Sequence, residues 1–125
     1  MMKKILILGS AGFLGTLARY YMQGFVQSFT GTTFPFGTMV VNLSGCFLLG
    51  FLNQLLTDRF LSDPQWRLFL TIGFCGAYTT FSTLTYETFR LGESHEYWYA
   101  TANVFFSLLL GLIFLWLGML LARLI

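Results

Sequence analysis

Four apolar stretches divide the chain, and short polar joints separate them. The stretches span residues 5–26, 34–56, 66–89 and 98–122. Each is close to the ~20 residues that a helix needs to cross a hydrocarbon core of ~30 Å. The last stretch contains FFSLLLGLIFLWLGMLL, which is continuously apolar, whereas a barrel strand would alternate apolar and polar residues. The pattern therefore predicts an all-α membrane protein with four transmembrane helices.

Composition supports this class and narrows it. The 125 residues are 56% hydrophobic and 10% charged, which excludes a soluble domain with a mostly polar surface. No repeat or low-complexity linker interrupts the sequence, so residues 1–125 are expected to form a single four-helix transmembrane domain surrounded by membrane lipid. The net charge of +2 is small and its basic residues are scattered, which predicts no nucleic-acid partner.

The two cysteines are expected to be packing residues. Cys46 and Cys75 lie inside apolar stretches, with no His, Asp or Glu at ligand spacing. A disulfide framework or a cysteine-based metal site is therefore not predicted. Small residues four positions apart should let helix backbones approach one another. Three such pairs stand out: Ala11 with Gly15, Gly73 with Ala77, and Ser107 with Gly111.

Basic residues are unevenly divided between the two sides of the membrane. If the N-terminus is cytoplasmic, the positive-inside rule compares five basic residues on that side with two on the other. The five are Lys3, Lys4, Arg59, Arg67 and Arg123, and the two are Arg19 and Arg90. The bias favours a cytoplasmic N-terminus but is modest, because the first two lysines supply most of it.

The third apolar stretch carries a concentration of hydroxyl groups in GFCGAYTTFSTLTYETF, residues 73–89. Polar groups in hydrocarbon are costly without partners, so these should face protein or water. Gly73 and Gly76 precede the Thr79–Thr80 pair and permit a helix break near the middle of the stretch, which would free carbonyl oxygens for a cation or a water-filled cavity. Alternatively, the hydroxyls bond to carbonyls one turn earlier and only soften the helix. Composition leaves both interpretations open.

Isolated amides are the other polar groups in these stretches. Asn42 lies in the second, and Asn103 and Ser107 lie four apart in the fourth, on one helix face. Such an Asn can simply join two helices by a hydrogen bond. Together with Phe81, whose ring edge is partly positive, these donors also suit a path for a small anion. Glu87 is the single carboxylate within an apolar stretch, and it lies near one end, so no mid-membrane proton-coupling carboxylate is predicted.

Three segments together resemble the Fluc fluoride channels, also called the CrcB family. They are GTLARY at 15–20, GTMVVNLSG at 37–45, and GFCGAYTTFST at 73–83 followed by Glu87. The likeness covers essentially the whole chain, including its length and the order of its segments. The resemblance implies a multi-pass protein of the inner (plasma) membrane with dual topology. It also implies an antiparallel homodimer with two fluoride pores and a structural sodium ion at the dimer centre.

The resemblance also assigns roles by matching position. Asn42 would line the pore, and Phe81 would be the first ring of a pair of phenylalanines along it. Further pore-lining donors would be Ser82, Thr83, Asn103 and Ser107, and Gly76 and Thr79 would offer main-chain carbonyls to the sodium ion. The implied function is a passive, fluoride-selective channel that exports fluoride from the cytoplasm and relieves its toxicity, and not an enzyme.

The sequence departs from the family pattern at three positions. Leu84 replaces the second phenylalanine, and Gly111 and Leu115 replace hydroxyl residues in the row that Asn103 and Ser107 begin. A homodimer is expected to tolerate these losses. Alternatively, a related chain supplies the missing groups in a heteromer. The charge bias supports this alternative, because each subunit of such a pair has one fixed orientation in the membrane.

Two other classes of membrane protein fit the sequence less well. A small multidrug exporter needs a carboxylate in its first helix, and residues 5–26 contain none. A non-conducting structural subunit would share the small-residue contacts, but it has no need of a helix break followed by Thr-Thr-Phe.

Overall fold

The computed structural model describes residues 1–58 and 63–125 of the chain. Its four spans are Met2–Thr30, Phe36–Asp58, Pro64–Glu93 and Tyr97–Leu124, and each is long and apolar enough to cross a membrane. The described ranges contain helices, turns and loops but no strand. The predicted all-α membrane protein with four transmembrane helices is therefore confirmed.

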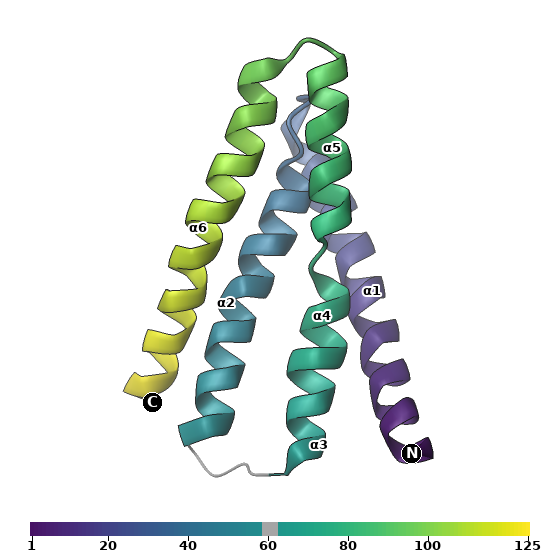
Figure 1. Ribbon diagram of the computed structural model, residues 1–125, viewed down its shortest axis with the longest axis vertical. Coiled ribbons are helices and arrows are strands. Elements are labelled where there is room, and N and C mark those ends of the chain that lie inside the picture. Colours follow the sequence, from purple (N-terminus) through teal and green to yellow (C-terminus); the bar gives the residue numbers. More distant parts are fainter. Residues whose placement is uncertain (59–62) are drawn as a thin grey trace.

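Three of the spans are single helices, and the third is divided. The single helices are α1 (Met2–Thr30), α2 (Phe36–Asp58) and α6 (Tyr97–Leu124). The third span consists of α3 (Pro64–Arg67), the π-helical stretch η1 (Leu68–Cys75), α4 (Gly76–Tyr78) and α5 (Phe81–Glu93). Figure 1 shows the change of direction between α4 and α5.

Successive spans alternate in direction. The N-terminus, the C-terminus, the last turn of α2 and the start of α3 lie at one end, which we call the basic end (Figure 1). The joints between α1 and α2 and between α5 and α6 lie at the opposite end. The basic end carries Lys3, Lys4, Arg67 and Arg123, whereas Arg90 lies near the opposite end. Arg59, which also contributes to the predicted charge bias, lies outside the described residues.

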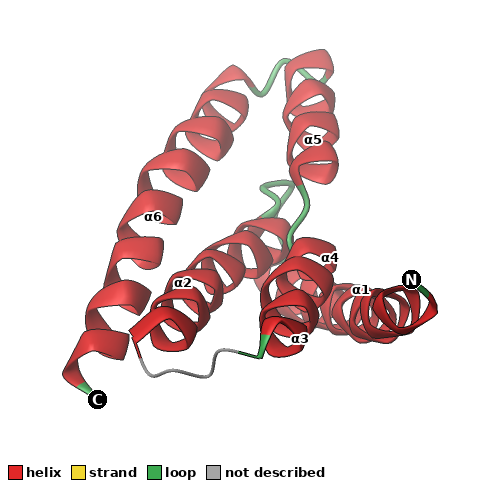
Figure 2. Cartoon of the chain, turned by 60° about the horizontal axis from the view of Figure 1, so that its bottom comes forward, coloured by secondary structure: helices red, strands yellow, loops and turns green. Residues whose placement is uncertain are grey.

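Small residues bring helix backbones together at two of the three predicted pairs, whereas Gly111 of the third pair meets only the side chain of Cys46. Gly73 of η1 lies against Ala11 of α1, because a Cβ added at Gly73 would be 2.5 Å from the Ala11 Cβ. One turn along, a Cβ added at Gly15 would be 3.1 Å from the Ala77 Cβ. Even a methyl group at Gly73 or Gly15 would force α1 away from the third span. Figure 2 shows α1 beside α3 and α4, with α2 and α6 on the other side of these segments.

The helix break lies at Thr79 and Thr80, whose backbones are extended with φ/ψ of −82°/158° and −149°/112°. The Thr80 Oγ1 then accepts a hydrogen bond from the Thr83 N–H at 3.2 Å and caps α5. The predicted break near the middle of the third span is confirmed. Hydroxyl bonding to the preceding turn occurs as well, from Thr79 Oγ1 to the Cys75 carbonyl at 3.0 Å and from Thr85 Oγ1 to the Phe81 carbonyl at 2.9 Å. Both interpretations of the hydroxyl cluster thus hold, for different residues.

Candidate functional site

Asn42 of α2 holds the helix break with both atoms of its amide. Its Oδ1 accepts from the Thr80 N–H at 2.8 Å, and its Nδ2 donates to the Thr80 carbonyl at 3.2 Å. Thr80 is 6% exposed, so water does not readily replace these bonds. An Asn side-chain amide has two N–H groups, and only one is used here. Asn42 therefore joins α2 to the break and keeps one donor.

The same contact frees a carbonyl of the third span. The Thr80 N–H would continue the α-helical ladder by donating to the Gly76 carbonyl, but it donates to Asn42 instead. Gly76 is exposed, and a Cβ added there would meet no heavy atom within 4 Å. Thr79, three residues on, is half-buried and extended. Free carbonyl oxygens at an unwound helix are the kind of ligand that holds sodium in membrane proteins. Gly76 and Thr79 therefore fit the predicted role of offering main-chain carbonyls to a sodium ion.

The end of α4 is positioned from α2 as well. A Cβ added at Gly45 would collide with the Thr79 Cγ2, so the break can pack here only against glycine. The Ser44 Oγ donates to the Val41 carbonyl at 3.1 Å and lies 2.9 Å from the Tyr78 hydroxyl. Because the Ser44 proton is used in this way, Tyr78 is the donor to Ser44. Packing and hydrogen bonding from α2 thus fix both sides of the break.

A cavity of about 270 Å³ opens beside the break, and we call it the central cavity. Asn42 from α2, Phe81 from α5 and Ser107 from α6 all line it, together with Gly76 and Thr79. Ser107 is 8% exposed, and its Oγ has no hydrogen-bond partner among the described residues. A buried hydroxyl without a partner is costly, so the Ser107 hydroxyl is available to bond with a ligand in the cavity, including one that accepts a hydrogen bond.

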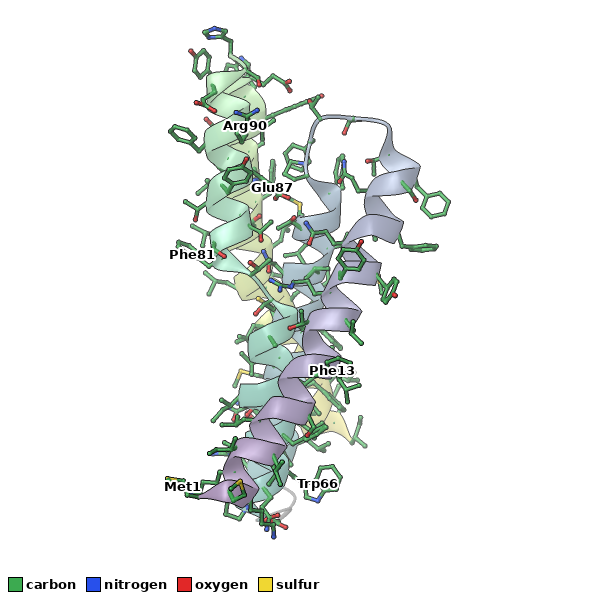
Figure 3. The ribbon with its side chains drawn as sticks, turned by 90° about the vertical axis from the view of Figure 1, so that its right-hand side faces the viewer. Met1, Phe13, Trp66, Phe81, Glu87 and Arg90 are labelled. Atoms are coloured by element: carbon green, nitrogen blue, oxygen red, sulfur yellow. The ribbon has the colours of Figure 1, made fainter. Side chains whose placement is uncertain are left out.

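The remaining predicted pore residues lie elsewhere around the break. Ser82 is exposed, and Thr83 is half-buried and belongs to the cap of α5. Asn103 is fully buried and donates from Nδ2 to the Thr88 Oγ1 at 2.9 Å, which joins α6 to α5. None of these three lines the central cavity. Phe81 is 76% exposed and projects outward from the bundle (Figure 3).

A second polar cluster was not predicted from the sequence. The Thr38 Oγ1 donates to the Glu87 Oε1 at 2.6 Å, and the Gln23 Nε2 donates to the Thr38 Oγ1 at 2.9 Å. These three residues line a cavity of about 950 Å³ between α1 and α5, which we call the upper cavity. Figure 3 shows Glu87 on the side of α5 that faces α1 and α2. The sequence feature that could have indicated this cluster was Thr38, which lies one turn before Asn42 on the same face of α2.

The polar side chains that line the central cavity are one amide, hydroxyls and two thiols, set among apolar side chains that include Phe81, and none of the lining residues is a carboxylate. The described residues contain no group of three or more His, Cys, Asp or Glu side chains that would hold a metal ion. Neutral hydrogen-bond donors can replace water around an anion, whereas a carboxylate would repel it. The central cavity is thus suited to a small anion, and the free carbonyls at the break are suited to a cation.

These features define a small multi-pass membrane protein with a cavity and polar side chains at a broken helix. Sequence comparison gives the family. The family described as CrcB-like protein, Camphor Resistance (CrcB), matches residues 6–119. The chain therefore belongs to the CrcB family.

Several curated relatives share nearly the whole chain. It is 46% identical over 122 residues to the fluoride-specific ion channel FluC of Geotalea uraniireducens, covering 98% of each chain. It is 48% identical over 124 residues to the protein of that name from Chlorobaculum tepidum, covering 99% of this chain and 98% of the other. The protein of that name from Pyrococcus horikoshii is 44% identical over 119 residues, covering 95% of this chain and 94% of its own.

Proposed function

We propose that this chain is a fluoride-selective ion channel that lets fluoride leave the cytoplasm passively and so relieves its toxicity. The observation that carries the proposal is that Asn42, Phe81 and Ser107, from three different spans, all line one cavity at the helix break. The family relationship supplies the anion, because its curated relatives are named fluoride-specific ion channels. The protein is a channel and not an enzyme.

Fluoride holds its water tightly, so a pore must offer replacement donors. The unused N–H of the Asn42 amide and the unpaired Ser107 hydroxyl are two such donors. The partly positive edge of the Phe81 ring is a third group that can face an anion without a formal charge. Uncharged donors release the ion more readily than a fixed positive charge would, and conduction requires that release.

Passive export fits the way fluoride enters cells. In acidic surroundings, neutral HF crosses the lipid and dissociates in the more alkaline cytoplasm, where the anion is trapped. A selective pore in the plasma membrane lets the accumulated anion flow outward down its gradient. No energy source is required.

The proposed assembly is an antiparallel dimer built around the break. Gly76 and Ser82 are exposed near the middle of the third span, where lipid cannot satisfy polar groups. Phe81 between them is 76% exposed. A second copy in the opposite orientation would cover these groups and bring two sets of Gly76 and Thr79 carbonyls together. That arrangement would form the sodium site that the family resemblance implies.

The homodimer is the assembly that we propose first, and the charge distribution supports a heteromeric alternative. The basic end carries Lys3, Lys4, Arg67 and Arg123, which the positive-inside rule keeps on the cytoplasmic side. An antiparallel homodimer needs half of its copies inserted the other way. A related chain with the opposite bias of basic residues would insert in the inverted orientation and so remove this conflict. That chain could also supply the aromatic ring that Leu84 does not.

Reconstitution of the purified chain tests the function and the assembly together. Liposomes loaded with fluoride or chloride are treated with a potassium ionophore, and efflux is followed with ion-selective electrodes. We expect fluoride efflux well above chloride efflux from the chain alone, with Leu84→Phe altering the rate only several-fold. Equal efflux of the two anions would contradict selectivity. A chain that is silent alone, but conducts when co-expressed with a related chain of opposite charge bias, would establish the heteromer.

A further inference from the structure

The polar row on α6 is interrupted at Gly111, one turn after Ser107, and the structure shows what lies opposite the gap. Gly111 is buried, and a Cβ added there would lie 3.5 Å from the Cys46 Sγ of α2. The thiol of one helix is therefore next to the place where the other helix lacks a side chain.

Two parallel rows face each other at this point. Asn42 and Cys46 are four residues apart on α2 and both line the central cavity. Ser107 and Gly111 are four apart on α6, which runs in the same direction as α2 (Figure 1). Asn42 and Ser107 thus form one level of the cavity, and the next level is formed by Cys46 and Gly111.

The first level already indicates a ligand. Ser107 is 8% exposed, it lines the cavity, and its hydroxyl has no hydrogen-bond partner within the part of the chain that the structure describes. An anion passing this hydroxyl would reach the next level one helical turn away, about 5.4 Å along the axis. At that level Cys46 of α2 lies opposite Gly111 of α6, and its thiol has a proton to donate.

We propose that the Cys46 thiol contacts fluoride and supplies, from α2, the donor that Gly111 does not supply from α6. This inference rests on the proposed channel function and deepens it. A neutral thiol is a weak hydrogen-bond donor and carries no charge to repel an anion. Its polarizable sulfur also fills space that a glycine leaves open. The row of hydrogen-bond donors then continues from Ser107 of α6 to Cys46 of α2.

Fluoride efflux from liposomes tests the donor directly. Cys46→Ser keeps a donor and should conduct at least as fast as the unmodified chain. Cys46→Ala removes it and should conduct about three-fold more slowly, as expected for one weak hydrogen bond. Gly111→Ser added to Cys46→Ala should restore the rate, because the new hydroxyl occupies the space that the sulfur leaves. Unchanged efflux in Cys46→Ala, or no recovery in the double variant, would overturn the proposal.

Val41→Ala provides the control for lost packing, because Val41 is a fully buried residue of the same helix that does not line the central cavity. Cys75 is the only other cysteine of the chain, and it lines the cavity, so it does not serve as this control. Val41→Ala should leave the efflux rate near that of the unmodified chain. If Val41→Ala slows efflux as much as Cys46→Ala does, the effect of Cys46 is one of packing, and the proposal is wrong.

A binding measurement separates this inference from the channel function. Cys75→Ala protein is treated with methyl methanethiosulfonate in fluoride or in chloride, and modification of Cys46 is followed by intact mass. We expect fluoride to slow the modification and chloride at equal concentration to leave it unchanged. Protection in a protein that does not conduct would support the site while contradicting the channel. Equal rates in both salts, or no modification in either, would overturn the role of Cys46 even if the chain conducts.

Discussion

Replacing Asn42 by alanine should destabilise the folded chain as well as slow fluoride. The substitution removes both bonds to the Thr80 backbone, at 2.8 and 3.2 Å, and leaves its N–H and carbonyl without partners at a residue that is 6% exposed. A buried polar group left unpaired costs about 1–3 kcal/mol in soluble proteins. Side-chain hydrogen bonds between membrane helices average about 0.6 kcal/mol, with a maximum of about 1.7 kcal/mol. Two such bonds give an expected loss of about 1–3 kcal/mol.

Unfolding of the detergent-solubilised protein in increasing sodium dodecyl sulfate, followed by tryptophan fluorescence, measures this loss. Asn53→Ala is the matched control, because Asn53 is an exposed Asn on the same helix. If Asn42→Ala is as stable as Asn53→Ala, the amide does not hold the break. Fluoride flux tests the second role of Asn42, which is to donate to the anion. Asn42→Asp places a carboxylate near the anion and should conduct less than Asn42→Ser. Equal flux through these two variants would limit the residue to joining α2 and the third span.

Three further changes test other parts of the site. Phe81→Ile keeps an apolar side chain at the cavity but removes the ring edge. Fluoride flux should therefore be lost, while the size-exclusion elution of the protein is unchanged. Flux at the unmodified rate would show that the ring does not contact the ion. Gly45→Ala should destabilise the protein by about 1–3 kcal/mol through its collision with Thr79, whereas Gly9→Ala, which meets open space, should be neutral or slightly stabilising. Thr38→Val should cost about 1–3 kcal/mol, because it removes the hydroxyl that Gln23 and Glu87 share and leaves only the 3.5 Å contact between the Gln23 Nε2 and the Glu87 Oε1. The exposed Thr101→Val should not change stability, and equal stabilities of the two variants would contradict the importance of this cluster.

The four spans and the break were predictable because they depend on local chemistry. An apolar run of about 20 residues can hardly do anything but cross the membrane as a helix. The glycines before Thr79 and Thr80 indicated where that helix could open, and the pairs of small residues indicated where α1 meets the third span. Periodicity along one helix was enough for each of these predictions.

The partners across helices were not predictable in the same way. The sequence left open whether Asn42 joins helices or faces an ion. The structure shows that its amide joins α2 to the third span, and that one N–H of the amide has no partner in this contact. Gln23, Thr38 and Glu87 meet from three separate spans, and their contact depends on the relative rotation of the helices. The same is true of Cys46 and Gly111, whose opposition is set by the register of α2 and α6.

The central claim is that this chain forms a passive pathway selective for fluoride. The reversal potential in a planar bilayer tests it most directly, with a ten-fold fluoride gradient, equal chloride on both sides, and no gradient of pH or sodium. A passive fluoride-selective channel should reverse at the fluoride equilibrium potential, about 59 mV from zero for a ten-fold gradient of a monovalent ion. Reversal near zero, or a current that needs a proton or sodium gradient, would contradict the account.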